Sequence, residues 1–360
     1  MVIKVIKERI INLQNILNDG EAFLITSGSN RFYLTGFNSS AGAVYVSRKS
    51  AVFFIDFRYY EKAKNTIDTC QVRLFDKGDR DIASLCGEEN IKTIFVETNT
   101  VSLSQHSYYC NLFEGIEISK QNKLDQKLNE MRSVKTKDEL SFITAAQKLT
   151  DQTFNYICEH IAVGRSERDI MLDMEFFMRK LGAEGVSFDF IVVSGKNSSM
   201  PHGVPTEKII EKGDFITMDF GAVAYGYCSD MTRTVAVGNI SAEQNTVYDT
   251  VLKAQTTACA AIKGGINCGA VDKIARDIIY DAGYKGCFGH SLGHGVGIDI
   301  HESPNLSPNN TTVLKTGNVV TVEPGIYIEN KFGVRIEDMV YVTDDGCINL
   351  TKSDKKLIVL

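Results

Sequence analysis

The chain has 360 residues, a net charge of −6 and no basic tract, so a nucleic-acid-binding protein is not expected. Its composition is that of an ordinary globular protein, and no apolar run reaches the length of a membrane span. Residues 1–17 place apolar side chains at helical spacing among Lys, Glu and Arg, unlike a signal peptide. We therefore expect a cytoplasmic protein with no membrane partner. Its nine cysteines contain no CxxC pair and are expected to be free thiols.

The first 120 residues alternate short β runs with helix-like segments, which predicts a small α/β domain. The predicted strands cover 22–26, 43–47, 51–56 and 91–97, and the predicted helices after the first cover 58–67 and 81–88. A highly charged stretch with almost no apolar content follows at 119–139. We place the domain boundary in this stretch, so that the first domain covers residues 1–125 and the second covers residues 126–360.

The second domain shows the same order of elements twice. Thr136 with Glu139 fits a capping box, in which each side chain satisfies a backbone N–H at a helix start. Helix pairs are predicted at 138–161 with 166–182, and at 241–265 with 271–284, and β-rich segments follow them at 187–237 and 313–350. Two copies of helix, helix and strands predict an α+β domain with internal pseudo-two-fold symmetry.

The last 150 residues concentrate acids in apolar surroundings, where a lone carboxylate is costly to bury. The four acids are Asp219 in MDFGA, Asp230 in SDMTRT, Glu323 in VEPGIY and Glu337 in RIED. The turn-rich segment between the first two indicates a hairpin that brings them together. Arg335 is a natural ion-pair partner for Glu337, but it cannot serve four acids. A bound metal pair would compensate all of them.

Four of the six histidines lie in or just before the same region: His202, His290, His294 and His301. A single histidine there is more often a hydrogen-bonded core residue, whereas a cluster favours metal binding or proton transfer. The segment 289–293 also matches GxSxG, the nucleophile motif of serine hydrolases, but no buried strand is predicted before it. The histidines after Ser291 are too close in sequence to complete that triad. HExxH is absent, so a helix-borne zinc site is not expected.

The order Asp, Asp, His, Glu, Glu in these contexts resembles the creatinase/aminopeptidase P metallopeptidases, peptidase family M24, which have the "pita-bread" fold. NRFYLTGF and FIDFRYYEKA resemble the N-terminal domain of the Xaa-Pro peptidase branch, and MRSVKTKDEL resembles its linker helix. SFDFIVVSGKNSSMPHG, GHSLGHGVGIDIHE and GVRIEDMVYV resemble its catalytic core. The resemblance covers the whole chain. It implies a small α/β domain of the creatinase/prolidase N-terminal type, followed by a pseudo-symmetric pita-bread domain, α+β overall.

The resemblance also implies a role for each site residue. Two divalent cations are expected, bridged by Asp230 and Glu337, with Asp219 holding one ion, and His294 and Glu323 holding the other. Ligands that are mostly oxygen suit Mn²⁺, with Co²⁺, Zn²⁺ or Fe²⁺ as alternatives. The remaining residues are His202 as a second catalytic residue beside Glu323, and His290, His301 and Arg335 as substrate-binding residues. In the implied mechanism a metal-bridged hydroxide attacks the scissile carbonyl, His202 or His290 stabilises the oxyanion, and Glu323 shuttles the proton.

The expected enzyme is an Xaa-Pro aminopeptidase that acts on the N-terminus of short proline-containing peptides. A peptide bond to proline has no N–H, which a site relying on metals and shape does not need. The N-terminal domain is expected to restrict access and to mediate a homodimer. The alternatives are an Xaa-Pro dipeptidase (prolidase), a metal-free creatinase-like C–N hydrolase, and a non-enzymatic binding module. The last two predict substituted metal ligands, and all five positions keep their ligands.

Overall fold

The computed structural model describes residues 2–360, which divide into two compact units with the boundary between Met131 and Arg132. We call them the N-terminal unit and the C-terminal unit. The boundary predicted after residue 125 falls inside a helix, α6 (Lys123–Ser133). Within the described range, no helix combines the length and the apolar character that a membrane span requires.

The N-terminal unit is built on a mixed sheet with the strand order β4-β3-β2-β1-β5-β6. Its strands are β1 (Glu21–Ile25), β2 (Ala43–Ser47), β3 (Ala51–Ile55), β4 (Gln71–Leu74), β5 (Thr93–Val96) and β6 (Glu117–Ser119). Its other helices are α1 (Val2–Gln14), α2 (Gly28–Thr35), α3 (Phe57–Thr66), α4 (Arg80–Glu89) and α5 (Leu103–Leu112). Apolar strand residues such as Phe23, Val44 and Phe53 are fully buried, which explains why these runs form the sheet. The predicted α/β domain is confirmed.

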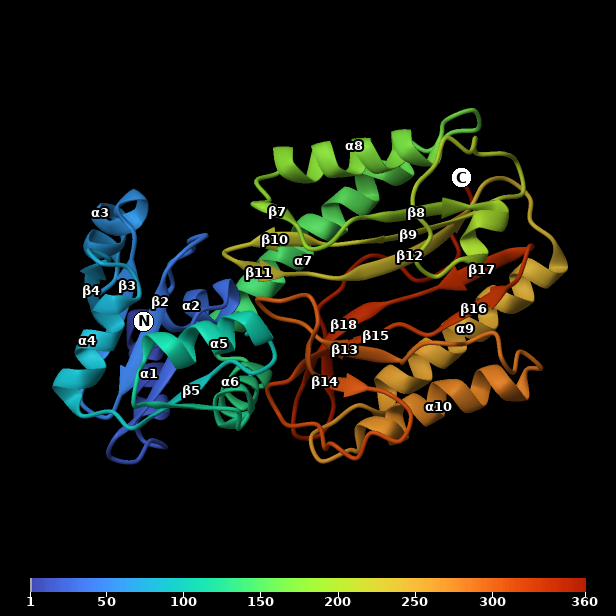
Figure 1. Cartoon of the computed structure of the whole chain (residues 1–360). Helices are drawn as coiled ribbons and strands as arrows, with labels where there is room; N and C mark the ends of the chain where they lie inside the picture. Colours follow the sequence, from blue (N-terminus) through green and yellow to red (C-terminus); the bar gives the residue numbers. More distant parts are fainter. Residues whose placement is uncertain (1) are drawn as a thin grey trace. The chain divides into compact units, whose positions relative to one another are not determined.

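The C-terminal unit repeats the order helix, helix, strands, as predicted (Figure 1). Capping boxes at Thr136, Ser166 and Ser241 start three of its helices, and Gly182 follows one of them with a φ of +104°. The helices are α7 (Lys137–Cys158), α8 (Glu167–Lys180), α9 (Ala242–Ala261), α10 (Cys268–Asp281) and the 3-10 helix η1 (Gly195–Ser199).

The strands of this unit belong to several sheets. The first half contains β7 (Gly185–Val186), β8 (Ile191–Ser194), β9 (Phe215–Phe220), β10 (Ala222–Ala224), β11 (Tyr227–Cys228) and β12 (Met231–Ala236). The second half contains β13 (Gly293–Gly295), β14 (Glu302–Leu306), β15 (Val319–Val322), β16 (Gly325–Ile328), β17 (Phe332–Arg335), β18 (Asp338–Val342) and β19 (Cys347–Asn349). The main sheets have the orders β12-β9-β8 and β14-β13-β15-β18-β19, and β16 pairs with β17.

Each helix pair packs on its own sheet. Met174 and Met178 of α8 join one apolar cluster with Ile216 and Met218 of β9. A second cluster unites the apolar faces of α9 and α10 with residues of β15 and β18. Figure 1 shows the two helix pairs on opposite sides of the strands. The strands of the unit therefore lie between the two helix pairs.

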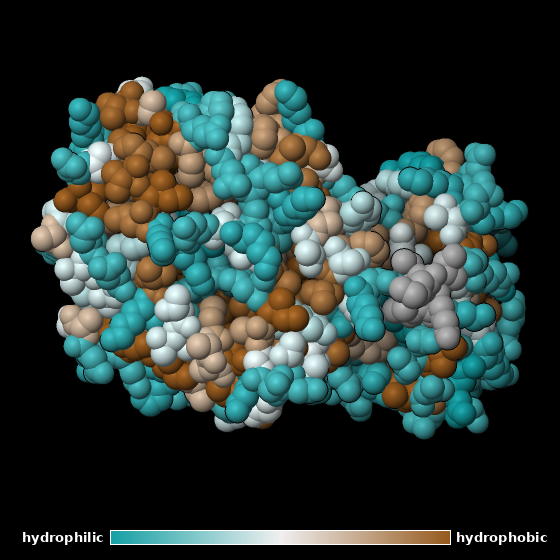
Figure 2. All heavy atoms as spheres, turned by 180° about the vertical axis from the view of Figure 1, so that it is seen from behind, coloured by the Kyte–Doolittle hydropathy of each residue, from teal (hydrophilic) through white to brown (hydrophobic). Residues whose placement is uncertain are grey.

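The surface is mixed in character. Figure 2 shows hydrophilic residues over much of the face seen from behind, with apolar residues gathered most densely at its upper left, on the C-terminal unit. Large apolar side chains that are exposed in this unit include Phe176 and Val204, at 72% and 75%. All nine cysteines, each within the described range, are free thiols, which confirms the expectation from the sequence.

Candidate metal centre

The five predicted metal ligands come from both halves of the C-terminal unit. Asp219 lies on β9, and Asp230 directly precedes β12. These two strands pair antiparallel with Asp219 opposite Thr232, so the predicted hairpin arrangement is confirmed. The other three residues lie in the second half: His294 on β13, Glu323 directly after β15, and Glu337 between β17 and β18. A backbone hydrogen bond of 3.1 Å from Glu337 N to Thr232 O joins the halves at the site.

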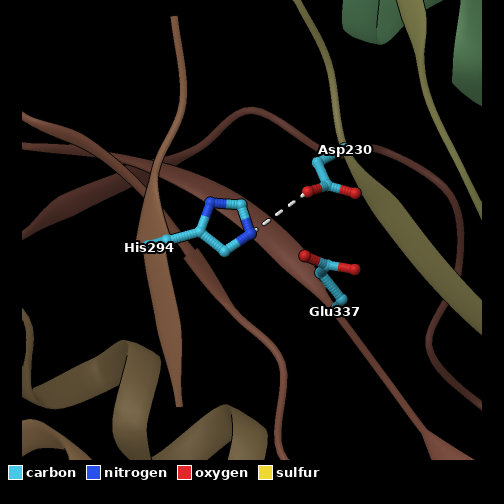
Figure 3. Close-up of side chains that lie close together, drawn as sticks. All are labelled: Asp230, His294 and Glu337. Atoms are coloured by element: carbon cyan, nitrogen blue, oxygen red, sulfur yellow. Dashed lines mark ion pairs between the residues drawn. The ribbon is translucent and has the colours of Figure 1, made fainter. Parts of the chain in front are cut away.

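The side chains of these residues converge. One ligand atom from each of Asp230, His294 and Glu337 lies within 4.8 Å of the other two, and Figure 3 shows the His294 ring directed toward both carboxylates. His294 Nε2 is 3.5 Å from Asp230 Oδ2 and 3.4 Å from Glu323 Oε1. All five residues line one cavity of about 1010 Å³. The structure therefore brings together every residue that the sequence marked as a ligand.

Burial disfavours ionisation of Asp230, Glu323 and Glu337. Burial raises the pKa of Asp230 well above its usual range, and the neighbouring Glu337, Asp219 and Glu323 carboxylates raise it further. Burial likewise raises the pKa of Glu337, with Glu323 and Asp219 as added causes. Burial raises the pKa of Glu323 to about 8, although the Arg335 guanidinium opposes this shift. Full ionisation of the acids would therefore bury more negative charge than the one guanidinium can neutralise.

The orientation of His294 points to a cation. Its Nδ1 lies 3.0 Å from the carbonyl oxygen of Gly295, which can only accept, so Nδ1 carries the ring hydrogen. Burial lowers the pKa of His294 to about 4, so the ring is neutral at pH 7. Nε2 therefore presents a lone pair to the carboxylate oxygens of Asp230 and Glu323. That arrangement is repulsive when the two acids are ionised, and a positive charge between the three groups would remove the repulsion.

Two carboxylate oxygens at the site are buried and have no hydrogen-bond partner within the described part of the chain: Asp219 Oδ1 and Glu337 Oε1. Unpaired buried acceptors are costly, and a bound cation satisfies them. The second oxygen of each group is held by the protein. Thr232 Oγ1 donates to Glu337 Oε2 at 2.7 Å, and Arg335 Nη2 donates to Asp219 Oδ2 at 2.6 Å. The donor set, four carboxylates and one imidazole, fits divalent cations.

A directed chain of hydrogen bonds runs beside the acids. Arg335 Nη1 donates to Tyr327 Oη at 2.9 Å, and Tyr327 Oη lies 2.9 Å from His290 Nε2. His290 Nδ1 is 2.9 Å from the carbonyl oxygen of Ser291, so Nδ1 carries the hydrogen and Nε2 accepts from Tyr327. Burial lowers the pKa of His290 to about 4, with the Arg335 charge as a further cause. Neutral His290 therefore has no N–H left for a substrate.

Tyr327 and Thr232 were not identified from the sequence. Both lie within recognised motifs, GIYI and SDMTRT, but nothing in a linear motif indicates which way a hydroxyl points. The pairing of β16 with β17 sets Tyr327 opposite Gly333, and the pairing of β12 with β9 sets Thr232 opposite Asp219. The signal that would have found them is therefore strand register, which one sequence does not give.

The remaining predicted residues also line the cavity. His202 lies on the loop after η1 and is exposed, and the exposed His301 ring packs edge-on against His294, with centroids 4.4 Å apart. Arg335 is only 3% exposed, and its guanidinium also contacts Thr232 Oγ1 and the carbonyl oxygen of Pro201. The two histidines are thus accessible from the cavity, whereas Arg335 is committed to protein groups.

Comparison with known proteins agrees with this geometry. The model of metallopeptidase family M24 matches residues 141–344, and that of the creatinase/prolidase N-terminal domain matches residues 9–134. The chain is 40% identical to the uncharacterized peptidase YqhT of Bacillus subtilis over 94% of this chain and 96% of that protein. Two solved structures are similar over nearly their whole length. The Xaa-Pro dipeptidase from Bacillus anthracis has a TM-score of 0.94 at 39% identity, covering 99% of this chain and 100% of that one.

The X-Pro aminopeptidase from Thermotoga maritima has a TM-score of 0.89 at 37% identity, covering 98% of this chain and 100% of that one. Both likenesses extend over the N-terminal and C-terminal units. A metallopeptidase family implies divalent metal ions, and the acids and the imidazole described above form the candidate group to hold them. The chain is a peptidase that belongs to metallopeptidase family M24 and carries a creatinase/prolidase N-terminal domain.

Proposed function

We propose that this peptidase uses two divalent metal ions to hydrolyse the Xaa-Pro bond at the N-terminus of short peptides. The proposal rests on candidate metal-ligand atoms that have no hydrogen-bond partner or that face one another. Asp219 Oδ1 and Glu337 Oε1 are buried without partners in the described chain, and the Nε2 lone pair of His294 faces carboxylates. These atoms need cations. Asp230 and Glu337 would bridge the two ions, Asp219 would bind one, and His294 and Glu323 would bind the other.

The ions, when bound, supply an activated water and a polarised carbonyl group. Every other task falls to side chains of the protein. Glu323 has two oxygens, so one can serve as a ligand while the other takes a proton and returns it to the leaving nitrogen. His202 is the better donor to a developing oxyanion, because His290 already donates its N–H to Ser291 and accepts from Tyr327. We therefore assign His202 to catalysis, and His290 and His301 to the walls of the substrate site.

The size of the cavity supports an aminopeptidase. About 1010 Å³ is at the upper end for ligand pockets and exceeds what a dipeptide occupies. Proline at the second position fits a site in which metals and shape replace contacts to the missing N–H. The name of the B. anthracis relative favours a second candidate, a dipeptidase restricted to Xaa-Pro. Mn²⁺ as the native metal, and a homodimer formed through an access-restricting N-terminal unit, stay predictions.

A peptide panel tests the proposal. The purified protein, stripped with EDTA and then supplied with Mn²⁺, is assayed against Ala-Pro, Ala-Pro-Ala-Ala and Ala-Ala-Ala-Ala. With Mn²⁺ we expect release of alanine from Ala-Pro-Ala-Ala and none from Ala-Ala-Ala-Ala. In EDTA we expect no release from either of these two peptides. Cleavage of Ala-Pro alone would establish the dipeptidase instead. Full activity in EDTA, or no cleavage of any proline peptide with metal present, would contradict the proposed function.

A further inference from the structure

Glu167, the first residue of α8, is a fully buried carboxylate outside the metal centre. Its Oε1 accepts hydrogen bonds from Ser194 N at 2.7 Å and Ser194 Oγ at 2.9 Å. Its Oε2 accepts from Thr206 N at 3.0 Å and Thr206 Oγ1 at 2.7 Å. Asn197 Nδ2 donates to both oxygens, at 3.1 and 3.2 Å. The burial of this carboxylate is therefore compensated by donors from one short stretch of chain.

Ser194 and Thr206 are the two ends of the loop that carries His202. Ser194 is the last residue of β8, and the chain leaves the sheet there to form η1 and then the segment 200–205. Backbone hydrogen bonds also tie the second end of the loop to the start of α8. Arg168 N donates to Thr206 O at 3.1 Å, and Glu167 N donates to Lys208 O at 3.1 Å. A single carboxylate thus fixes the backbone N–H groups at both ends of the loop.

The middle of the loop is held by residues of β17. Gly333 N donates to Ser198 Oγ at 2.9 Å, and Arg335 Nη1 donates to the carbonyl oxygen of Pro201 at 3.2 Å. The approach at Gly333 is so close that a Cβ there would lie 2.1 Å from Ser198 O. His202 therefore sits between an anchor at Pro201 and an anchor at Thr206, and the second anchor depends on Glu167.

We propose that Glu167 is a positioning residue that holds His202 over the cavity by closing the ends of its loop. The inference rests on the proposed function, in which His202 acts on the substrate. An ionised carboxylate is an acceptor at both oxygens, which matches the donors around it. In Glu167→Gln the side chain keeps its volume, but an NH₂ group faces the backbone N–H of Ser194 or Thr206. One end of the loop must then move, and a displacement of about 1 Å at a reacting group costs on the order of 10²-fold in rate.

The chain offers a matched control in the N-terminal unit. Glu97 is also fully buried and accepts from two backbone N–H groups, Thr26 N at 2.6 Å and Ser27 N at 2.8 Å. Two hydroxyls and an asparagine amide also donate to it: Thr26 Oγ1 at 3.4 Å, Ser27 Oγ at 2.5 Å and Asn30 Nδ2 at 2.7 Å. Glu97→Gln makes the same chemical change in a similar environment without touching the His202 loop.

A double-mutant cycle tests the proposal with wild type, Glu167→Gln, His202→Ala and the double variant, each loaded with Mn²⁺. We expect Glu167→Gln to lower kcat by roughly 10- to 100-fold, while KM and the amount of bound metal remain unchanged. In the His202→Ala background the same change should lower kcat by less than about twofold, because the residue it positions is gone. Glu97→Gln should leave kcat unchanged. An equal loss in both backgrounds, or an equal loss in Glu97→Gln, would overturn the positioning role.

Hydrogen exchange separates this inference from the proposed function. In Glu167→Gln, peptides covering 194–206 should exchange faster than in wild type, and peptides covering α9 should not change. If wild type cleaves no Xaa-Pro peptide, the proposed function fails while the exchange data still report on loop closure. Unchanged exchange at 194–206 would refute the inference whatever the activity. If Glu167→Gln does not fold, Thr206→Val removes a single donor to the same carboxylate. It must then show a smaller increase in exchange at 194–206 and a smaller loss of kcat.

Discussion

Arg335 and Asp219 are joined by a 2.6 Å hydrogen bond from Nη2 to Oδ2. This contact occupies one oxygen of the carboxylate and leaves Oδ1 buried without a partner in residues 2–360. Arg335 therefore orients Asp219 and leaves its remaining lone pairs free to face the proposed cation position. The guanidinium also compensates part of the buried negative charge, which explains why one arginine is tolerated among four acids.

Replacement of Arg335 by lysine should weaken metal binding. Lysine keeps the charge but loses the planar fork that contacts Asp219, Thr232 and Tyr327 together. We expect metal affinity to fall by about 10- to 100-fold, the size of effect seen for outer-shell partners of metal ligands. Titration calorimetry with Mn²⁺ measures it. Arg179→Lys is the control, since its pair with Glu175 is half exposed. Unchanged affinity in Arg335→Lys would contradict the orienting role.

The stability of the metal-free protein should fall as the pH rises from about 4.5 to about 8. Burial raises the pKa of Glu323 to about 8 from an ordinary value of 4.5. Between these values the unfolded chain has released the proton while the folded protein keeps it, so stability decreases with pH at about 1.4 kcal/mol per unit for this group. Urea unfolding in EDTA at pH 5, 6, 7 and 8 measures the slope.

With Mn²⁺ present the slope should reverse, because metal binds the carboxylates and displaces their protons, so that binding tightens with pH. The two sets of unfolding curves should therefore diverge as the pH rises. Parallel curves with and without metal would show that the acids do not bind the ion.

Much of the fold was predictable because its signals are local. The capping boxes at Thr136, Ser166 and Ser241 and the alternation of apolar strands with helices depend on residues a few positions apart. Short elements such as α2 and β4 were missed because they offer few residues for a periodic pattern. The helix α6 was not predicted because its sequence is mostly charged, although Leu124 and Leu128 within it are buried.

The site was predictable in its acids and histidines and not in its hydrogen bonds. The burial cost of the four acids predicted a shared centre, and the resemblance to family M24 supplied the full set of five ligands. The role of Glu167 depends on Ser194 and Thr206, which are 27 and 39 residues away and become its neighbours only through β8 and the return of the loop. The same holds for the contact between Lys135 and Glu302, which only the folded chain brings together.

Loss of the Lys135–Glu302 ion pair should destabilise the C-terminal unit strongly. Lys135 Nζ lies 2.8 Å from Glu302 Oε2, and the side chains are 1% and 6% exposed. Although burial opposes it, the charges of Lys135 and Arg132 lower the pKa of Glu302 to about 2, so its stabilising contribution is present above pH 4.5 and lost as the pH falls toward 2. Lys135→Met leaves the carboxylate with less compensation and should cost about 3–5 kcal/mol at pH 7.

Chemical denaturation at pH 7 and pH 3 measures this loss, which should shrink at the lower pH. The matched control is Lys273→Met, since Lys273 pairs with Asp277 on the surface at 72% and 53% exposure. An exposed pair of this kind contributes less than about 1 kcal/mol. Equal losses in the two variants would show that burial of the Glu302 pair has no energetic consequence.

Asp230→Asn should change stability in opposite directions with and without metal. In the metal-free protein, burial and the Glu337 carboxylate disfavour a charge on Asp230, and a neutral amide of similar volume removes that strain. The unfolding temperature in EDTA at pH 8 should therefore rise. With saturating Mn²⁺ it should fall relative to wild type, because a bridging ligand is lost and less binding energy stabilises the folded state. Asp345→Asn, at an exposed position, should move neither midpoint. If Asp230→Asn lowers both midpoints equally, Asp230 is a structural acid and the bridging role is wrong.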